Sequence, residues 1–322
     1  MDRKPRPSKS LLCAGLPETG KTTFLAALYH VVESGEVAGS LQIVDGALFE
    51  NDRNYIQTQR ERWIDFGKVE RNKADVQGPI LLTLTYAGAR SDIRLDLPDL
   101  SGETFRQHVE ERVVGKSFLE RLARTSGVLL FINPDNVREP FTIAQADCAL
   151  DAGNDEERQE GSASLPPHPE SDDSVPLPDS PSDEDSTFDP RDCCTAVKLV
   201  DLLQLMSRGL QVAPLPVAII VSAYDTLKNS PRYKDDPERY VREKLALLDQ
   251  YLRANTDRYT HRIFGVSAQG GSYTNDAERS TMVSKELASE RIEVRPIPAT
   301  SRHDISYPIR WLSDRAAVEV LE

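Results

Sequence analysis

The stretch Gly15-Leu-Pro-Glu-Thr-Gly-Lys-Thr22 is a full match to the pattern G-x-x-x-x-G-K-[ST]. It follows a short apolar run, residues 11–14, and precedes residues 21–32, whose apolar side chains recur at helical spacing. A glycine-rich loop between a strand and a helix turns backbone N–H groups, and the positive end of the helix, toward phosphate oxygens. We therefore predict a nucleotide-binding loop in which Lys21 reaches the terminal phosphates and Thr22 offers its hydroxyl to Mg²⁺. Its predicted binding residues are Gly15, Leu16, Pro17, Glu18, Thr19, Gly20, Lys21, Thr22 and Thr23.

Strands and helices alternate through the rest of the chain. Apolar runs predict strands at residues 80–86, 93–97, 127–132, 217–222 and 263–266. Helical spacing predicts helices at residues 104–124, 195–206, 240–252 and 309–320, with a polar and partly helical region at 47–66. A turn containing Gly88 joins the first two of these strands, so we expect them to pair antiparallel. The alternation predicts an α/β fold with a mostly parallel sheet and one antiparallel strand pair. Together with the motif at residues 15–22, it indicates a three-layer P-loop NTPase domain.

The negative charge of the chain is concentrated in one segment. The 322 residues carry a formal net charge of −13, and residues 151–192 hold nine Asp and five Glu against two Arg. This segment is rich in proline and has few large apolar side chains, so it cannot bury enough surface to offset the entropy of ordering it. We predict a disordered acidic insertion at 151–192, within a single domain formed by residues 11–150 and 193–322, after a basic tail at 1–10.

The composition of the chain also limits which kinds of partner the protein can bind and indicates its location in the cell. An acidic chain lacks the basic surface that non-specific nucleic-acid binding and adhesion to anionic membranes require. No apolar stretch approaches the 18 residues of a membrane span, and no signal-peptide pattern follows the basic start. We therefore expect a cytoplasmic protein with no nucleic-acid partner and no membrane span, with its four cysteines reduced.

A second motif lies at the end of the strand predicted at residues 93–97. Asp99-Leu-Ser-Gly102 has the form D-x-x-G and is followed by Glu103. At this place Asp99 can hold Mg²⁺ through water, and the Gly102 N–H can bind a γ-phosphate and release it after hydrolysis. The predicted catalytic residues are Lys21, Gly102 and Glu103, and the predicted metal ligands are Thr22 and Asp99.

Two later strand ends carry groups suited to reading a guanine base. Ser222-Ala-Tyr-Asp225 places a carboxylate that can accept hydrogen bonds from the N1 and N2 groups of guanine, which adenine does not offer. Ser267 and Ala268 begin a loop of small residues whose backbone N–H groups can bind guanine O6. In this order after the phosphate loop, Ser222, Asp225, Ser267 and Ala268 favour GTP and GDP over ATP.

These motifs together resemble the translation-factor-related class of P-loop GTPases, and more closely the bacterial double-GTPase-type domains. The closing segment 303–312 also looks like the end of that group. The resemblance implies a GTP-dependent switch, often encoded in bacterial defence systems beside effector and adaptor proteins. We expect such a protein partner at the switch regions, with helix 104–124 as the surface that changes with nucleotide.

The sequence departs from the family pattern at three places. Ala223 stands where the base-reading motif usually has a lysine, Glu103 stands where many relatives have a water-positioning glutamine, and residues 67–79 contain no Thr or Ser for Mg²⁺. Two alternatives to a hydrolysing switch stay open, the first supported by these departures and the second only by the phosphate loop. One is a non-hydrolysing nucleotide-binding scaffold, and the other is an ATP-using ATPase or kinase in which Arg106, Arg121 or Arg124 closes over the phosphates.

Overall fold

The computed structural model describes residues 7–44, 50–69, 79–98, 103–140, 189–209 and 214–313. Residues 1–6 of the predicted basic tail and residues 151–188 of the predicted acidic insertion lie outside this set. Within it, the last residues of that insertion, Pro190–Asp192, form the 3-10 helix η2. No helix of the described part is long and apolar enough to cross a membrane.

A single eight-stranded sheet forms the centre of the domain, in the order β2-β3-β4-β1-β5-β6-β7-β8. The strands β4, β1, β5, β6 and β7 run parallel. The predicted antiparallel pair is confirmed as β3 with β4, and β2 with β3 and β7 with β8 are also antiparallel. The strands are β1 (Ser8–Ala14), β2 (Gln42–Ile43), β3 (Ile80–Thr85), β4 (Asp92–Leu97), β5 (Thr125–Ile132), β6 (Leu215–Val221), β7 (Tyr259–Ser267) and β8 (Glu293–Arg295).

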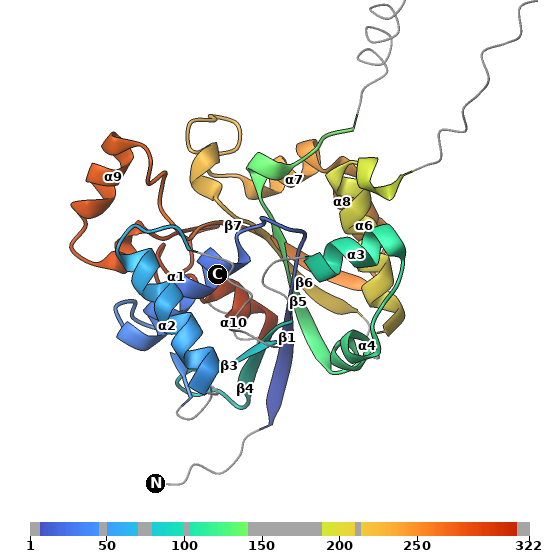
Figure 1. Ribbon diagram of the computed structural model, residues 1–322, viewed down its shortest axis with the longest axis horizontal. Coiled ribbons are helices and arrows are strands. Elements are labelled where there is room, and N and C mark those ends of the chain that lie inside the picture. The colour runs from blue at the N-terminus through green and yellow to red at the C-terminus, as the bar shows by residue number, and fades with distance from the viewer. Residues whose placement is uncertain are drawn as a thin grey trace, which may run out of the picture.

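Helices cover both faces of the sheet, which confirms the three-layer α/β fold (Figure 1). One face packs against α1 (Lys21–Ser34), α2 (Glu50–Ile64) and α10 (Tyr307–Ser313). The other packs against α3 (Glu103–Glu111), α4 (Lys116–Leu122), α6 (Thr195–Gly209), α7 (Pro237–Lys244) and α8 (Ala246–Ala254). The remaining elements are α9 (Asp276–Val283) and the 3-10 helices η1 (Pro134–Asn136), η3 (Tyr224–Leu227) and η4 (Ala288–Arg291).

The central strands are buried on both faces, as their continuous apolar runs predict. In β5, Leu129 and Phe131 belong to the apolar cluster under α1 and α2, whereas Val128, Leu130 and Ile132 belong to the cluster under α3 and α6. This alternation follows from the two-residue period of a strand. The paired clusters fix the sheet between its helix layers and hold the strand ends in place.

Two of the helices predicted as continuous are broken. The predicted helix 104–124 is α3 and α4, separated by residues 112–115, where Arg112 has a φ of 54° and Gly115 is extended. The predicted helix 240–252 is α7 and α8, separated at Leu245, whose φ and ψ are −130° and 44°. Helical spacing of apolar residues continues through both breaks, so periodicity alone does not reveal them.

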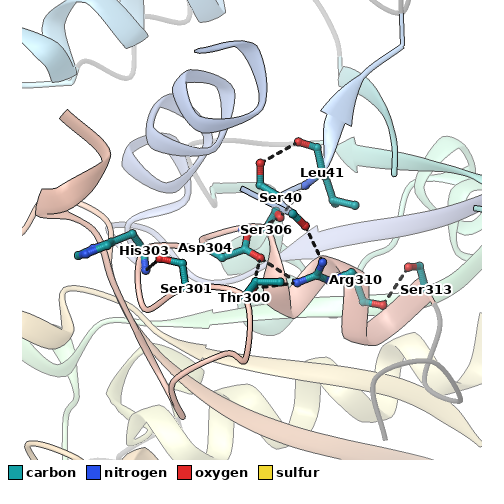
Figure 2. Close-up of polar contacts among 10 residues, drawn as sticks. Ser40, Leu41, Thr300, Ser301, His303, Asp304, Ser306, Arg310 and Ser313 are labelled. Atoms are coloured by element: carbon teal, nitrogen blue, oxygen red, sulfur yellow. Dashed lines mark hydrogen bonds and ion pairs between the residues drawn. The ribbon is translucent and has the colours of Figure 1, made fainter. Parts of the chain in front are cut away.

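Hydrogen bonds around the fully buried carboxylate of Asp304 connect the closing segment, residues 303–312, to the chain after α1 (Figure 2). Asp304 Oδ2 accepts hydrogen bonds from Arg310 Nη2 at 2.8 Å and Thr300 Oγ1 at 2.9 Å. Its Oδ1 accepts one from Ser306 Oγ, which itself accepts one from the Leu41 backbone N–H at 3.0 Å. Asp304, Ser306 and Arg310 thus join α10 to the chain between α1 and β2.

Candidate nucleotide-binding site

The predicted site residues gather at one edge of the sheet. The strands β1, β5, β6 and β7 are parallel, so their carboxyl ends lie at the same edge. The phosphate loop follows β1, Asn133 follows β5, Ser222 follows β6, and Ser267 ends β7. Ligands of open α/β sheets bind at this edge.

The two glycines of the phosphate loop occupy crowded places with positive φ. A Cβ on Gly15 would lie 2.9 Å from the backbone oxygen of Phe131 and 2.8 Å from Thr19 Oγ1. Gly20, the N-cap of α1, is left-handed with a φ of 78°, and a Cβ there would lie 3.0 Å from Ser222 Oγ. The loop is therefore packed closely against the ends of β5 and β6, and its tight turn depends on glycine.

Lys21 folds back across the loop that precedes it. Its side chain is 3% exposed, and Nζ donates hydrogen bonds to the backbone oxygens of Gly15 at 2.9 Å and Leu16 at 2.8 Å. A third contact joins Nζ to Thr19 Oγ1 at 3.2 Å. The loop thus holds an ammonium group beside the N-terminus of α1, and both favour an anion at this place.

Two asparagines that the sequence analysis did not single out support the loop from the end of β5. The Nδ2 groups of Asn133 and Asn136 both donate to the backbone oxygen of Glu18, at 3.0 Å and 3.1 Å. Glu18 has a φ of 63°, a conformation that costs a non-glycine residue free energy. The paired amides therefore stabilise the left-handed backbone at Glu18.

Ser222 contacts the phosphate loop. Its buried Oγ lies 2.9 Å from the backbone oxygen of Thr19 and 3.1 Å from that of Ile132, and it can donate to either. This contact joins the end of β6 to the loop after β1. The predicted contact of Ser222 with a nucleotide base stays a prediction.

Asp225 and Ser267 are brought together from different strands, as the prediction of a shared base site requires. Asp225 lies in η3, where its Oδ1 accepts a hydrogen bond from Ser267 Oγ at 2.6 Å. Ser267 Oγ in turn accepts one from the Gly270 backbone N–H at 3.0 Å. Burial raises the pKa of Asp225, and the Ser267 hydrogen bond opposes that rise. Ala268 follows Ser267, and its backbone oxygen accepts a hydrogen bond from Trp63 Nε1 at 2.9 Å.

The predicted Mg²⁺ site is described only in part. Thr22 lies in the first turn of α1, and its hydroxyl forms no hydrogen bond with another described residue. An oxygen ligand beside a phosphate loop suits Mg²⁺, which binds through few protein oxygens together with substrate phosphates. Asp99 and Gly102 lie outside the described residues, and Glu103 is described only as the first residue of α3.

Two of the three arginines considered as a lid, Arg121 and Arg124, line one cavity. Arg121 Nη1 donates to both carboxylate oxygens of Asp96, at 2.9 Å and 3.1 Å. The cavity has a volume of about 350 Å³, and Ser8, the first residue of β1, and Asp96 also line it. A role for either in closing over phosphates stays a hypothesis. Arg106 pairs with Glu110 one turn along α3.

Solved structures similar to this chain include two elongation factors and the protein Era. The bacterial selenocysteine-specific elongation factor EF-Sec is 12% identical, with a TM-score of 0.34 over 86% of this chain and 28% of its own. Era from Aquifex aeolicus bound to GDP.AlF4- is 11% identical, with a TM-score of 0.32 over 87% of this chain and 58% of its own. The elongation factor SelB from Methanococcus maripaludis with the GTP analogue GppNHp is 8% identical, with a TM-score of 0.32 over 88% and 36%.

This chain therefore spans less than two thirds of the length of each of these proteins. No curated protein matches it in sequence. The sequence pattern of the Double-GTPase 1 family matches residues 12–312, which include the phosphate loop, the Asp225 and Ser267 pair and the closing segment. The chain belongs to the Double-GTPase 1 family.

Proposed function

We propose that this domain binds guanine nucleotides with Mg²⁺ and works as a GTP-hydrolysing switch in the cytoplasm. The observation that carries the proposal is the meeting of two groups at one sheet edge. One is the Lys21 ammonium in its glycine loop, and the other is the Asp225 carboxylate bonded to Ser267. Family membership supports the same ligand.

The two groups would bind opposite ends of the nucleotide. Loop N–H groups and Lys21 would hold the phosphates, with Thr22 and Asp99 serving the metal when it is bound. Asp225 would accept hydrogen bonds from guanine N1 and N2, while backbone N–H groups after Ser267 would meet O6. Adenine offers neither the N1 donor nor O6, so this arrangement discriminates by leaving buried polar groups unpaired.

An exchange of base preference tests the assignment of Asp225. Xanthine carries a carbonyl oxygen where guanine carries its N2 amino group, so Asp225→Asn, with an amide donor, should favour it. We expect wild-type protein to bind GDP more tightly than XDP in calorimetry, and Asp225→Asn to reverse that order. The exposed Asp257→Asn serves as the matched control. Unchanged GDP affinity in Asp225→Asn would contradict the proposal.

Hydrolysis is tested separately from binding. Multiple-turnover release of phosphate from GTP, dependent on Mg²⁺ and lost in Lys21→Ala, is the expected result, because Lys21 stabilises charge on the transferred phosphoryl group. Tight GTP binding without turnover would instead support the non-hydrolysing scaffold. In that case Glu103, in place of glutamine, would be the first position to change.

We further propose that α3 and α4 present the nucleotide state to a protein effector, in a bacterial defence system as the resemblance implies. These helices follow the Asp99–Gly102 motif directly in the chain. Hydrogen exchange should show different protection of α3 and α4 between the GDP form and the form bound to a GTP analogue. Equal protection in the two forms would remove these helices as the effector surface.

A further inference from the structure

The end of α2 packs against the loop that follows β7. Trp63 is fully buried, and its Nε1 donates a hydrogen bond to the backbone oxygen of Ala268 at 2.9 Å. Ala268 is the residue after Ser267, whose hydroxyl donates to Asp225. The indole is thus one hydrogen bond away from the backbone of the proposed base-reading loop, residues 267–271.

Arg291 makes the second connection between α2 and this loop. Its buried guanidinium lies between the rings of Trp63 and Phe66, with the guanidinium carbon 4.2 Å and 4.4 Å from the ring centroids. Its Nη2 also donates to the backbone oxygen of Trp63 at 3.2 Å. Arg291 forms no ion pair with a carboxylate of the described residues. Stacking and carbonyls at the end of α2 therefore satisfy the buried cation.

The loop approaches Arg291 so closely that only glycine fits. Gly270 has a φ of 92°, and a Cβ there would lie 2.6 Å from the Arg291 backbone oxygen. The Gly270 N–H donates to Ser267 Oγ, which donates to Asp225. A continuous set of contacts thus runs from α2 through Arg291 and the loop to the carboxylate.

We propose that Trp63 and Arg291 are positioning residues for guanine recognition, which hold the loop 267–271 where its N–H groups meet O6. This inference rests on the proposed function. Ala223 replaces the lysine whose stem packs on the base in related GTPases, so recognition depends on Asp225 and on the loop backbone. Hydrogen bonds to fixed donors weaken steeply with small displacements, and a loop held by a buried aromatic is displaced least.

Base selectivity distinguishes this role from ordinary core packing. A residue that only fills the core changes stability and affects all nucleotides alike. A residue that positions the O6-binding loop affects nucleotides that carry O6. IDP has O6 but lacks the N2 amino group. A change in the position of the loop should therefore lower the affinities for GDP and IDP equally and leave the affinity for ADP unchanged.

The test compares Trp63→Phe with Trp311→Phe in the full chain. Trp63→Phe removes the Nε1 donor and keeps an aromatic ring, and Trp311 is a buried tryptophan of α10 that serves as the control. By calorimetry, Trp63→Phe should weaken GDP and IDP by about 3- to 10-fold, the equivalent of one lost hydrogen bond. ADP binding in Trp63→Phe, and all three ligands in Trp311→Phe, should stay within about 2-fold of wild type.

A second variant guards against misfolding of the first. Gly270→Ala disturbs the same junction from the loop side, and it should lower GDP and IDP affinity without changing α2. Suppose that wild type binds GDP more tightly than ADP. If both variants then keep the wild-type affinities for GDP and IDP, or lose affinity for GDP, IDP and ADP to the same extent, this inference is wrong while the proposed function stands. If wild type shows no preference for GDP over ADP, the proposed function fails, and this inference fails with it.

Discussion

The paired amides on Glu18 give a prediction whose size follows from the geometry. Among the described residues, the Asn136 side chain bonds only the Glu18 backbone oxygen, whereas Asn133 also accepts a hydrogen bond from the Asp135 N–H. Asn136→Ala is therefore the cleaner change. A hydrogen bond of this kind contributes about 0.5–1.5 kcal/mol net, and the left-handed conformation of Glu18 costs about 1–2 kcal/mol. Loss of one amide should therefore weaken the hold on the loop by about 1 kcal/mol.

If this hydrogen-bond energy stabilises the conformation of the loop that binds nucleotide, its loss should lower the affinity for GDP. Asn136→Ala should raise the Kd for GDP about 5-fold, and the double change with Asn133→Ala should raise it more than either single change. Calorimetry at fixed pH and Mg²⁺ measures the affinity, and thermal unfolding shows whether the domain stays folded.

Glu18→Gly supplies the control for this reasoning. Glycine adopts a positive φ without strain, so in a Glu18→Gly background the Asn136→Ala change should cost less affinity than in wild type. An Asn136→Ala protein with wild-type GDP affinity, or an equal cost in both backgrounds, would refute the idea that the amides hold Glu18 for binding.

Three further predictions follow from the described contacts. Asp304→Ala leaves Arg310 buried without its carboxylate partner, so the free energy of unfolding measured in urea should fall by about 3–5 kcal/mol. A fall below about 1 kcal/mol would contradict a stabilising role for the Asp304–Arg310 pair. Burial raises the pKa of Asp225, so its protonation should weaken GDP binding as pH falls toward that pKa. For Asp225→Asn, calorimetry at the same series of pH values should show no such fall in GDP affinity. Ala223→Lys restores an aliphatic stem beside the base and should tighten GDP binding several-fold in the same assay. Weaker GDP binding in this variant would contradict the placement of residue 223 beside the base.

The sequence predicts the parts of the fold that depend on local pattern. The apolar runs and the glycine loop locate the central strands, the first helix and the phosphate loop, because burial on both faces and tight turns leave local signatures. The strands β2 and β8 are two and three residues long, too short for any period to show. The breaks at residues 112–115 and at Leu245 lie inside continuous helical spacing, so they depend on tertiary packing.

The supporting residues of the site are the ones that the sequence does not reveal. Trp63 meets Ala268 from 205 positions away, and Asn133 meets Glu18 from 115. Such contacts leave no mark on neighbouring residues, because only the folded sheet brings the partners together. The sequence draws attention to Asp225 and Ser267 because each follows or ends a predicted strand after the phosphate loop, and the structure shows that the two side chains meet. Trp63, in contrast, looks like any core aromatic.

Competition for a bound fluorescent guanine nucleotide by GTP, GDP and ATP, each with and without Mg²⁺, tests the central claim most directly. The account predicts displacement by GTP and GDP at concentrations at least about 10-fold lower than by ATP, because Asp225 and the loop after Ser267 bind groups that adenine lacks. It also predicts that Mg²⁺ strengthens displacement by GTP. Displacement by ATP at the same or lower concentration than GTP would contradict the assignment of this site to guanine nucleotides.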